Sequence, residues 1–282
     1  MTRLVVLCLL LLAGPLHAQP GGKPVTIDGA VQFDITSQIN HRGYRLFIHQ
    51  PPALDPALTY PVLYVLDGNQ YFAAGSDMLQ RLIEQDSIGP ALLVAIGYPE
   101  TDPGIWRARR SYDMTPSPSI ESAEMQQTGG AALFLRVIEE EIKPFVAARY
   151  NVDTSEQALF GHSYGGLFVL HTLFTHTDAF SSYISSSPSI WYNTQEVLRD
   201  EAAFAERAGA GAVKAQLLLT SAADEELAAS PERMLANASE LAERLAALEG
   251  FRSERVVFAG EDHFTVSFAA LNRALRFALP PR

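Results

Sequence analysis

Cysteine is nearly absent from this chain of 282 residues, which contains only one, Cys8. Leu7 precedes it, where lipoprotein processing needs a small residue, so we do not expect lipid anchoring at this position. A chain with a single cysteine forms no intramolecular disulfide and no thiolate metal site. The packing of the core must therefore hold the fold together.

Long hydrophobic runs are also missing. The apolar run from Leu4 to Leu12 is too short to cross a bilayer, which takes about 20 apolar residues. Arg3 precedes this run and Leu16-His17-Ala18, a sequence suited to cleavage, follows it, which is the pattern of an export signal. We expect residues 1–18 to be a cleavable signal peptide. The mature chain should begin near Gln19, be periplasmic or secreted, and have no stable membrane anchor.

Positive charge is scarce, since 21 Lys and Arg residues stand against 32 Asp and Glu residues, for a formal net charge of -11. Binding to nucleic acid or to an anionic membrane depends on basic patches, so neither is an expected partner. No Gly/Ser-rich linker or block of like charges divides the chain. We therefore expect one domain over residues 19–282.

Two hydrophobic patterns predict a β-sheet. Val31–Ile39 and Tyr44–His49 alternate apolar and polar side chains, which is typical of an antiparallel hairpin at a sheet edge. Nearly continuous apolar runs are typical of parallel strands covered on both faces. Five such runs follow along the chain: Pro61–Leu66, Ala91–Ile96, Ala158–Phe160, Val213–Leu219 and Arg255–Phe258.

Amphipathic helical patterns lie between those runs. One apolar face comprises Phe134, Ile138, Ile142 and Phe145; another comprises Met234, Ala238, Leu241, Leu245 and Leu248. Ser230-Pro231 precedes the second pattern as a candidate N-cap and first helical residue. Alternating strands and helices predict a three-layer α/β fold, with a mostly parallel central sheet and helices on both faces. Ligands bind such sheets at the carboxyl ends of the strands.

The segment from Tyr98 to Gln127 lacks clear periodicity. It holds four prolines together with Trp106, Arg107, Arg109 and Arg110. Loops of this length in a compact domain are usually functional or disordered. We interpret residues 98–127 as a lid-like or substrate-facing segment, with a plain surface loop as the alternative.

The motif Gly161-His162-Ser163-Tyr164-Gly165 matches Gly-x-Ser-x-Gly. It follows the short strand pattern Ala158–Phe160 and precedes a helical pattern, which is the setting of a nucleophile elbow. Such a sharp turn exposes the serine hydroxyl on a strained backbone, and we expect Gly161 and Gly165 to supply the conformational freedom. The motif predicts Ser163 as a nucleophile.

A serine hydroxyl needs a neighbouring base, and in this architecture the chain order is serine, acid, histidine. His171 and His176 lie within or just after the helix that Ser163 introduces, too close in sequence to fold back onto it. His263 follows the last predicted strand and the turn Gly260-Glu261-Asp262. We therefore predict His263 as the general base.

The acid should follow the preceding strand, where Asp224 and Glu225 are the candidates. Its role is to hold the imidazole in the right tautomer and to stabilise the imidazolium. If neither carboxylate does so, a Ser-His dyad carries the reaction. Oxyanion donors are expected from the backbone amide of Tyr164 and, in the turn Asp67-Gly68-Asn69, from the amide of Asn69.

These motifs resemble those of the esterase-D-like α/β-hydrolases, and within them the trilactone siderophore esterases of bacteria. The matching stretches are Leu66–Asn69, Gly161–Phe168, Ser186–Tyr192 and Gly260–Phe264, which together span nearly all of the expected mature chain. The resemblance implies an α/β-hydrolase fold and hydrolysis of esters through an acyl-enzyme. It also implies that neither a metal nor an organic cofactor takes part, and that exported members act in the periplasm.

Carried over position by position, the resemblance supports Ser163, His263 and the two oxyanion amides. It also implies a basic residue near the active site among Arg107, Arg109 and Arg110. Some members of the siderophore branch manage without a well-placed acid, which leaves Asp224 and Glu225 open.

The implied substrate is a small-molecule ester, in this branch an iron-loaded catecholate siderophore. Such a ligand is anionic and aromatic, and arginine pairing and aromatic stacking would suit it. Trp106 and Trp191 are predicted to supply the aromatic side, with Tyr192 a weaker candidate; each also fits ordinary packing.

Two other readings remain open. The same chemistry could serve a carbohydrate acyl ester, a thioester or a simple acyl ester. Alternatively, the chain could be a non-catalytic binding protein that keeps the fold; that reading predicts a disrupted serine turn or a missing late histidine, and the sequence shows neither.

Overall fold

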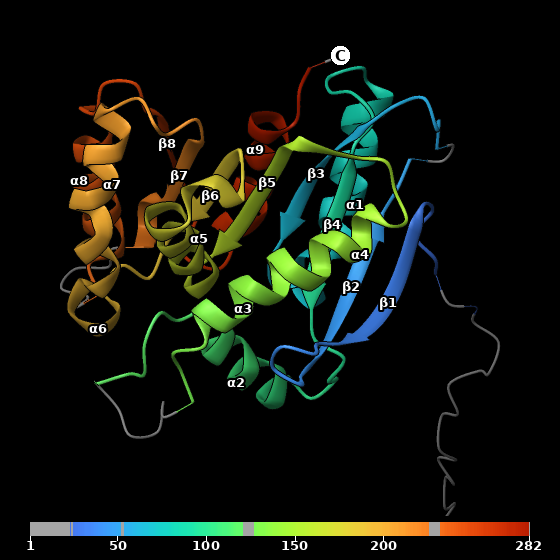
Figure 1. The fold of residues 1–282 in the computed structure, drawn as a ribbon, viewed down its shortest axis with the longest axis horizontal. Helices are drawn as coiled ribbons and strands as arrows, with labels where there is room; N and C mark the ends of the chain where they lie inside the picture. Colours follow the sequence, from blue (N-terminus) through green and yellow to red (C-terminus); the bar gives the residue numbers. More distant parts are fainter. Residues whose placement is uncertain (1–22, 24, 52–53, 121–126, 226–231, 282) are drawn as a thin grey trace, which may run out of the picture.

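The computed structural model describes residues 23, 25–51, 54–120, 127–225 and 232–281. The expected signal peptide, with Cys8, lies outside them. Eight strands form one sheet in the order β1-β2-β4-β3-β5-β6-β7-β8 (Figure 1). β1 (Ala30–Thr36) and β2 (Gly43–His49) pair antiparallel with each other, and β2 pairs antiparallel with β4, so the predicted hairpin does form one edge.

The other six strands are parallel. They are β3 (Tyr60–Val65), β4 (Leu92–Gly97), β5 (Val152–His162), β6 (Ser182–Ser186), β7 (Gln216–Ala222) and β8 (Arg252–Phe258). β6 was not predicted, because three of its five residues are serines. All five are buried nonetheless, since the serine hydroxyls have partners: Ser185 donates to the carbonyl of Gly166 at 2.9 Å, and Ser182 accepts from Gln216 at 2.9 Å.

Helices cover both faces of the sheet, as predicted (Figure 1). On one face lie α1 (Gly68–Glu84) and α9 (Val266–Ala278), which pack on a core that includes Leu63 and Val65. The opposite core includes Val62 and Tyr64. Its helices are α3 (Ala131–Val137), α4 (Lys143–Ala147), α5 (Tyr164–Thr175), α7 (Glu201–Gly209) and α8 (Met234–Ala246). Both faces of β3 are therefore buried, which explains its continuous apolar run.

Short helical segments complete the described chain: α2 (Pro103–Asp113), η2 (Ile138–Ile142), η3 (Thr177–Ala179), α6 (Tyr192–Gln195), η4 (Glu196–Asp200) and η5 (Ala223–Glu225). η2 is a π-helix between α3 and α4, where one regular helix was predicted. Pro144, in the first turn of α4, cannot donate a backbone hydrogen bond, and the amide of Lys143 bonds to the carbonyl of Ile138 instead. This five-residue spacing is that of a π-turn.

Two further expectations differ from the structure. α8 begins at Met234, with Arg233 before it, whereas Ser230-Pro231 lies outside the described residues. The segment of residues 98–127 is not one long loop, because it contains α2. Asp102 caps this helix by accepting from the amide of Gly104 at 2.7 Å, and Pro103 occupies its first position. Both residues are standard helix-start signals.

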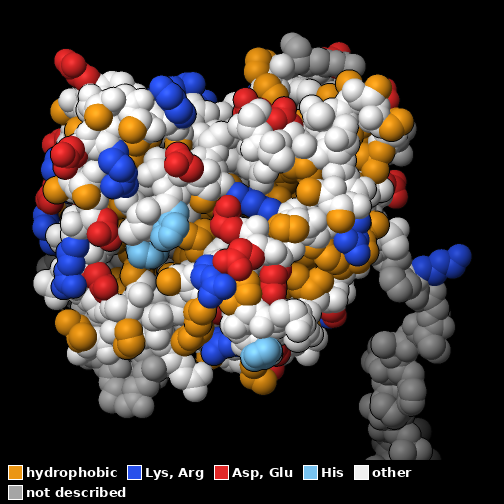
Figure 2. Space-filling view, in the orientation of Figure 1, with side chains coloured by type: hydrophobic (Ala, Val, Ile, Leu, Met, Phe, Trp, Pro, Cys, Tyr) orange, Lys and Arg blue, Asp and Glu red, His pale blue; other side chains and the backbone are white. Residues whose placement is uncertain are grey.

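Acidic and basic side chains are interspersed on the face of the molecule that Figure 2 shows. Among the described residues, none of the helices is long and apolar enough to span a membrane.

Candidate active site

Ser163 lies on a strained turn at the carboxyl end of β5. Its backbone angles are φ 61 and ψ -116, far from the helical values that begin with Tyr164 in α5. Hydrogen bonds hold the turn from β6: the amide of Ser163 donates to the carbonyl of Ser186 at 2.9 Å, and the carbonyl of Ser163 accepts from the amide of Ser189 at 3.2 Å. A strained non-glycine residue fixed in this way is typical of a nucleophile elbow.

The glycines of the motif act differently from the expectation, since neither Gly161 nor Gly165 has a positive φ; the strain lies on Ser163 itself. A Cβ at Gly161 would meet the carbonyl oxygen of Gly165 at 2.3 Å, and one at Gly166 would meet the carbonyl oxygen of Ser186 at 2.8 Å. These glycines therefore permit close approach of backbone to backbone.

His263 follows β8 and reaches the serine. Its Nε2 lies 3.1 Å from Ser163 Oγ, although 100 residues separate the two. Asp262 holds the loop: its Oδ1 accepts from the amides of Phe264 and Thr265, each at 2.9 Å. These two backbone hydrogen bonds lower the pKa of Asp262. The imidazole is 29% exposed and therefore accessible to a ligand.

Glu225, rather than Asp224, lies against the histidine. Glu225 Oε1 is 2.8 Å from His263 Nδ1, and its side chain is fully buried. Its Oε2 accepts from the amide of Ala222 at 3.1 Å, which fixes the carboxylate. Asp224 contributes its backbone instead, because its amide donates to the carbonyl of Glu261 at 3.2 Å and so ties the loop after β7 to the loop after β8.

The two predicted oxyanion donors lie at helix starts. Tyr164 is the first residue of α5, and Asn69 is the second residue of α1. The Asn69 side chain is fastened to Tyr98, donating to its carbonyl at 2.9 Å and accepting from its amide at 2.7 Å. Backbone amides in the first turn of a helix have no intrahelical partner and favour negative charge. Asn69 does not line either cavity described below.

A second histidine lies beside the first, and the sequence reasoning missed it by considering only histidines after Ser163. The ring of His162 is 4.7 Å from that of His263, and its Nδ1 lies 3.2 Å from Ser186 Oγ. Burial, together with the nearby charges of His263 and Arg110, holds the pKa of His162 well below its usual value. His162 is therefore neutral near pH 7. Its position in the nucleophile motif itself was the available signal.

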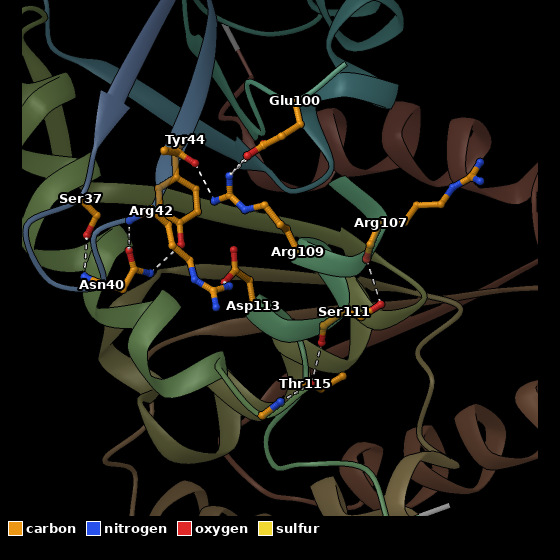
Figure 3. A network of polar contacts seen from close by, with 12 residues as sticks. Ser37, Asn40, Arg42, Tyr44, Glu100, Arg107, Arg109, Ser111, Asp113 and Thr115 are labelled. Atoms are coloured by element: carbon orange, nitrogen blue, oxygen red, sulfur yellow. Dashed lines mark hydrogen bonds and ion pairs between the residues drawn. The ribbon is translucent and has the colours of Figure 1, made fainter. Parts of the chain in front are cut away.

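Of the three candidate arginines, Arg109 is not at the site. It donates to Glu100 at 2.7 Å and to the carbonyl of Gly43 at 2.6 Å, beside Tyr44 (Figure 3). Arg107 points away from this network. Arg110 faces the site but already has partners, donating to Asp67 Oδ1 at 2.6 Å and to the carbonyl of His162 at 2.9 Å. Burial lowers the pKa of Arg110, but the Asp67 carboxylate outweighs it and the net shift is upward.

Two cavities share four residues in their lining: Arg110, Ser163, His263 and Phe264. The larger, of about 580 Å³, also exposes Trp106, Arg107 and Phe268. The smaller, of about 410 Å³, is lined in addition by Tyr164, Ser189 and Trp191. Phe264 is 80% exposed, which is unusual for a phenylalanine. Tyr192, by contrast, is buried and donates to the carbonyl of Ser117 at 2.8 Å.

No group of three or more His, Cys, Asp or Glu side chains within the described part of the chain is placed to hold a metal ion. Serine, imidazole and carboxylate instead meet at the carboxyl ends of β5, β8 and β7. An α/β sheet with this arrangement defines a serine hydrolase of the α/β-hydrolase class.

Comparison with known proteins identifies the family. Residues 37–278 match the family model described as Putative esterase, and the chain belongs to this esterase family. The ferri-bacillibactin esterase BesA of Bacillus subtilis is 38% identical over 266 residues, 91% of each chain. The crystal structure of the BES protein from Bacillus cereus superposes with a TM-score of 0.82 at 33% identity, over 93% of this chain and 99% of that one. The structure of the siderophore hydrolase EstA from Aspergillus nidulans superposes with a TM-score of 0.80 at 29% identity, over 91% of this chain and 97% of that one.

Proposed function

We propose that this esterase hydrolyses the ester bonds of a trilactone siderophore of the catecholate type, with Ser163 as nucleophile, His263 as general base and Glu225 as the orienting acid. One observation carries the chemistry: His263 Nε2 lies 3.1 Å from Ser163 Oγ, while Glu225 Oε1 lies 2.8 Å from Nδ1 of the same ring. This order of contacts is the one that moves a proton from serine to imidazole.

The proposed reaction runs in two halves. Ser163 Oγ attacks the ester carbonyl as its proton passes to His263, and the amides of Tyr164 and Asn69 stabilise the tetrahedral oxyanion. His263 then protonates the departing alcohol, which leaves an acyl-enzyme. A water molecule, deprotonated by His263, attacks the acyl carbonyl and releases the carboxylate with a free serine. Buried Glu225 stabilises the imidazolium in both halves.

Two lines of support favour the substrate. BesA of Bacillus subtilis, which aligns over 91% of this chain, is named a ferri-bacillibactin esterase. The larger cavity also combines aromatic surface from Trp106, Phe264 and Phe268 with the cation of Arg107. Aromatic rings beside an arginine suit catecholate groups, which are planar and carry negative charge when they chelate iron. The iron enters as part of the substrate, and cutting the chelate releases it.

We further propose that the reaction takes place after export, in the periplasm or outside the cell. The supporting pattern is the charged start, short apolar run and cleavage sequence of residues 1–18. N-terminal sequencing of the protein from its native host, fractionated into periplasm, cytoplasm and medium, tests this proposal. A full-length chain found only in the cytoplasm would contradict it.

The test of function compares substrates on the mature enzyme. Purified protein is given a ferric catecholate trilactone, its iron-free form, and short p-nitrophenyl esters, and the products are identified by mass spectrometry. We expect kcat/KM for the trilactone to exceed that for the small esters by at least about 100-fold. A preference for the small esters would replace the proposal with a general acyl esterase.

Labelling with a fluorophosphonate probe, compared with the Ser163→Ala variant, separates an enzyme from a binding protein. The proposal requires one label per chain in the wild type and none in the variant. An unlabelled wild type that still binds the siderophore would support a non-catalytic binding protein.

A further inference from the structure

Arg110 joins the two halves of the candidate oxyanion site. Its Nε donates to Asp67 Oδ1 at 2.6 Å, and its Nη2 donates to the carbonyl of His162, the residue before the nucleophile, at 2.9 Å. Asp67 is the residue before α1 and belongs to the turn Asp67–Asn69. One guanidinium therefore bridges the end of β3 and the end of β5, and both oxyanion amides lie within two residues of its partners.

The contacts of Asp67 show how closely this bridge is built. Its side chain is 1% exposed, and its backbone is left-handed at φ 56. Asp67 Oδ2 has no hydrogen-bond partner among the described residues, and a Cβ at Gly165 would lie 3.5 Å from it. The carboxylate is thus inserted between the turn and the first residues of α5, where Arg110 supplies its compensating charge.

The turn is fastened on its other side as well. Asn69 exchanges two hydrogen bonds with the backbone of Tyr98, after β4. Gly68 lies so close to β4 that a Cβ there would be 2.9 Å from the carbonyl carbon of Ala95. On the β5 side, the amide of Leu66 donates to the carbonyl of Phe160 at 2.9 Å, so the strands that lead into the turn and the elbow are already paired. Beyond these strand ends, the side chain of Arg110 links the turn to the elbow.

These contacts leave little of Arg110 for a ligand. The side chain is 14% exposed and its charge is paired with Asp67, whereas Arg107 on the same helix is exposed and points away from the neighbouring network (Figure 3). We infer that Arg110 is a positioning residue, which holds the oxyanion turn Asp67–Asn69 against the nucleophile elbow, and that it is not the arginine that binds the substrate. This inference rests on the proposed function.

The matched control lies one residue away. Arg109 has the same 14% exposure, belongs to the same helix and forms an ion pair with Glu100 at 2.7 Å, but it lines neither cavity. Arg109→Met therefore removes a comparable ion pair from α2 without touching the bridge. Arg110→Lys keeps the charge, but one compact ammonium group does not reproduce the fork of donors that reaches two acceptors.

The experiment measures kcat and KM for a short p-nitrophenyl ester, and the affinity for a boronic acid that forms a tetrahedral adduct with Ser163. For Arg110→Met we expect kcat to fall about 100-fold, the size of effect seen when an oxyanion donor is lost, with KM within about three-fold. Boronate affinity should fall in parallel with kcat/KM. We expect a loss of about ten-fold in kcat for Arg110→Lys, and for Arg109→Met a kcat within about three-fold of the wild type.

The double variant Asp67→Asn/Arg110→Met separates a loss of stability from a loss of positioning. Arg110→Met alone leaves the buried Asp67 carboxylate unpaired, which destabilises the fold. The double variant should regain thermal stability, while kcat stays at least about 30-fold below the wild type. Recovery of full kcat in the double variant would overturn the inference. A raised KM with unchanged kcat in Arg110→Met would also overturn it, because that is the behaviour of a residue that binds the substrate. An equal loss of kcat in Arg109→Met would overturn it as well.

Measurements on the wild type distinguish a failure of the proposed function from a failure of the role assigned to Arg110. If it neither turns over any ester nor reacts with the fluorophosphonate, the proposed function fails. If it does both while Arg110→Met retains its kcat, only the role assigned to Arg110 fails.

Discussion

The floor and the rim of the active site are built in different ways. The floor, formed by Ser163, His263 and Glu225, follows the parallel strands β5, β8 and β7. It is held by backbone hydrogen bonds from the end of β6 and by the Asp262 carboxylate in the loop after β8. The rim consists of side chains such as Arg107 and Phe264, which are largely exposed. We infer that the floor sets kcat and the rim sets substrate preference.

The largest effect should come from breaking the floor. His263→Ala removes the proposed general base and should lower kcat by at least about 10⁴-fold, because members of such a set act as a unit. The far-UV circular dichroism spectrum should stay close to the wild type, while the melting temperature should fall because the buried Glu225 carboxylate loses its imidazole partner. Retention of most activity on p-nitrophenyl esters would remove His263 from the mechanism.

The acid gives the next largest effect. Glu225→Gln keeps the shape but removes the charge that stabilises the imidazolium, and kcat should fall about 10²- to 10⁴-fold. Asp224→Ala is the matched control, because only its backbone joins the two loops; its kcat should stay within about three-fold. Equal kcat values in Glu225→Gln and the wild type would support a Ser-His dyad.

The rim should respond in KM rather than in kcat. Phe264→Ala and Arg107→Ala each remove exposed surface from the larger cavity. KM for a ferric catecholate trilactone should rise about five- to 30-fold, the effect of about 1–2 kcal/mol of lost binding. Turnover of p-nitrophenyl acetate, which is too small to cover the rim, is the control and should change little. A fall in kcat for both substrates would show that floor and rim are not separable.

The smallest effect on turnover is expected at the far end of α2. Asp113 is fully buried, with Arg42 at 3.7 Å, and burial raises its pKa to about 6 although Arg109 and Arg42 oppose this. Because the folded protein holds this proton more tightly than the unfolded chain, stability falls from about pH 4 to about pH 6 and is then level. At pH 8 the ionised carboxylate costs about 3 kcal/mol, at 1.36 kcal/mol per pKa unit.

Asp113→Asn should remove that cost. Its free energy of unfolding should exceed that of the wild type by about 2–3 kcal/mol at pH 8 and match it near pH 4. Chemical denaturation at several pH values measures the difference, and kcat should stay within about three-fold. A variant that is less stable than the wild type at pH 8 would show that the carboxylate is better compensated than its burial implies.

The sequence predicted those parts of the molecule in which the apolar or polar character of each residue matches its burial. Val62 and its neighbours are apolar because β3 is covered on both faces, so the sheet could be read from composition. β6 could not, since its buried serines depend on partners far away in sequence. α2 was missed because Asp113 is its only buried residue and the helix is polar overall, although the Asp102-Pro103 start was visible.

The direction in which a side chain points was the second feature that the sequence could not predict. Asp224 and Glu225 are adjacent, and only the bonds to Glu261 and Ala222 decide which carboxylate turns toward His263. Arg109 and Arg110 are also adjacent, but a step of one residue on a helix turns the side chain by about 100°, toward Glu100 in one case and Asp67 in the other. In both pairs, residues distant in sequence determine which side chain faces the site, so the neighbouring sequence does not predict it.

The order of the strands has a consequence for inactivation. His263 lies in the loop after β8, the outermost strand on its side of the sheet, whereas Ser163 follows β5 near the middle. Edge elements open locally at lower free energy than central ones. Mild heat or denaturant should therefore detach the base while the nucleophile's strand stays protected from hydrogen exchange, and catalytic activity would vanish before the molecule as a whole unfolds.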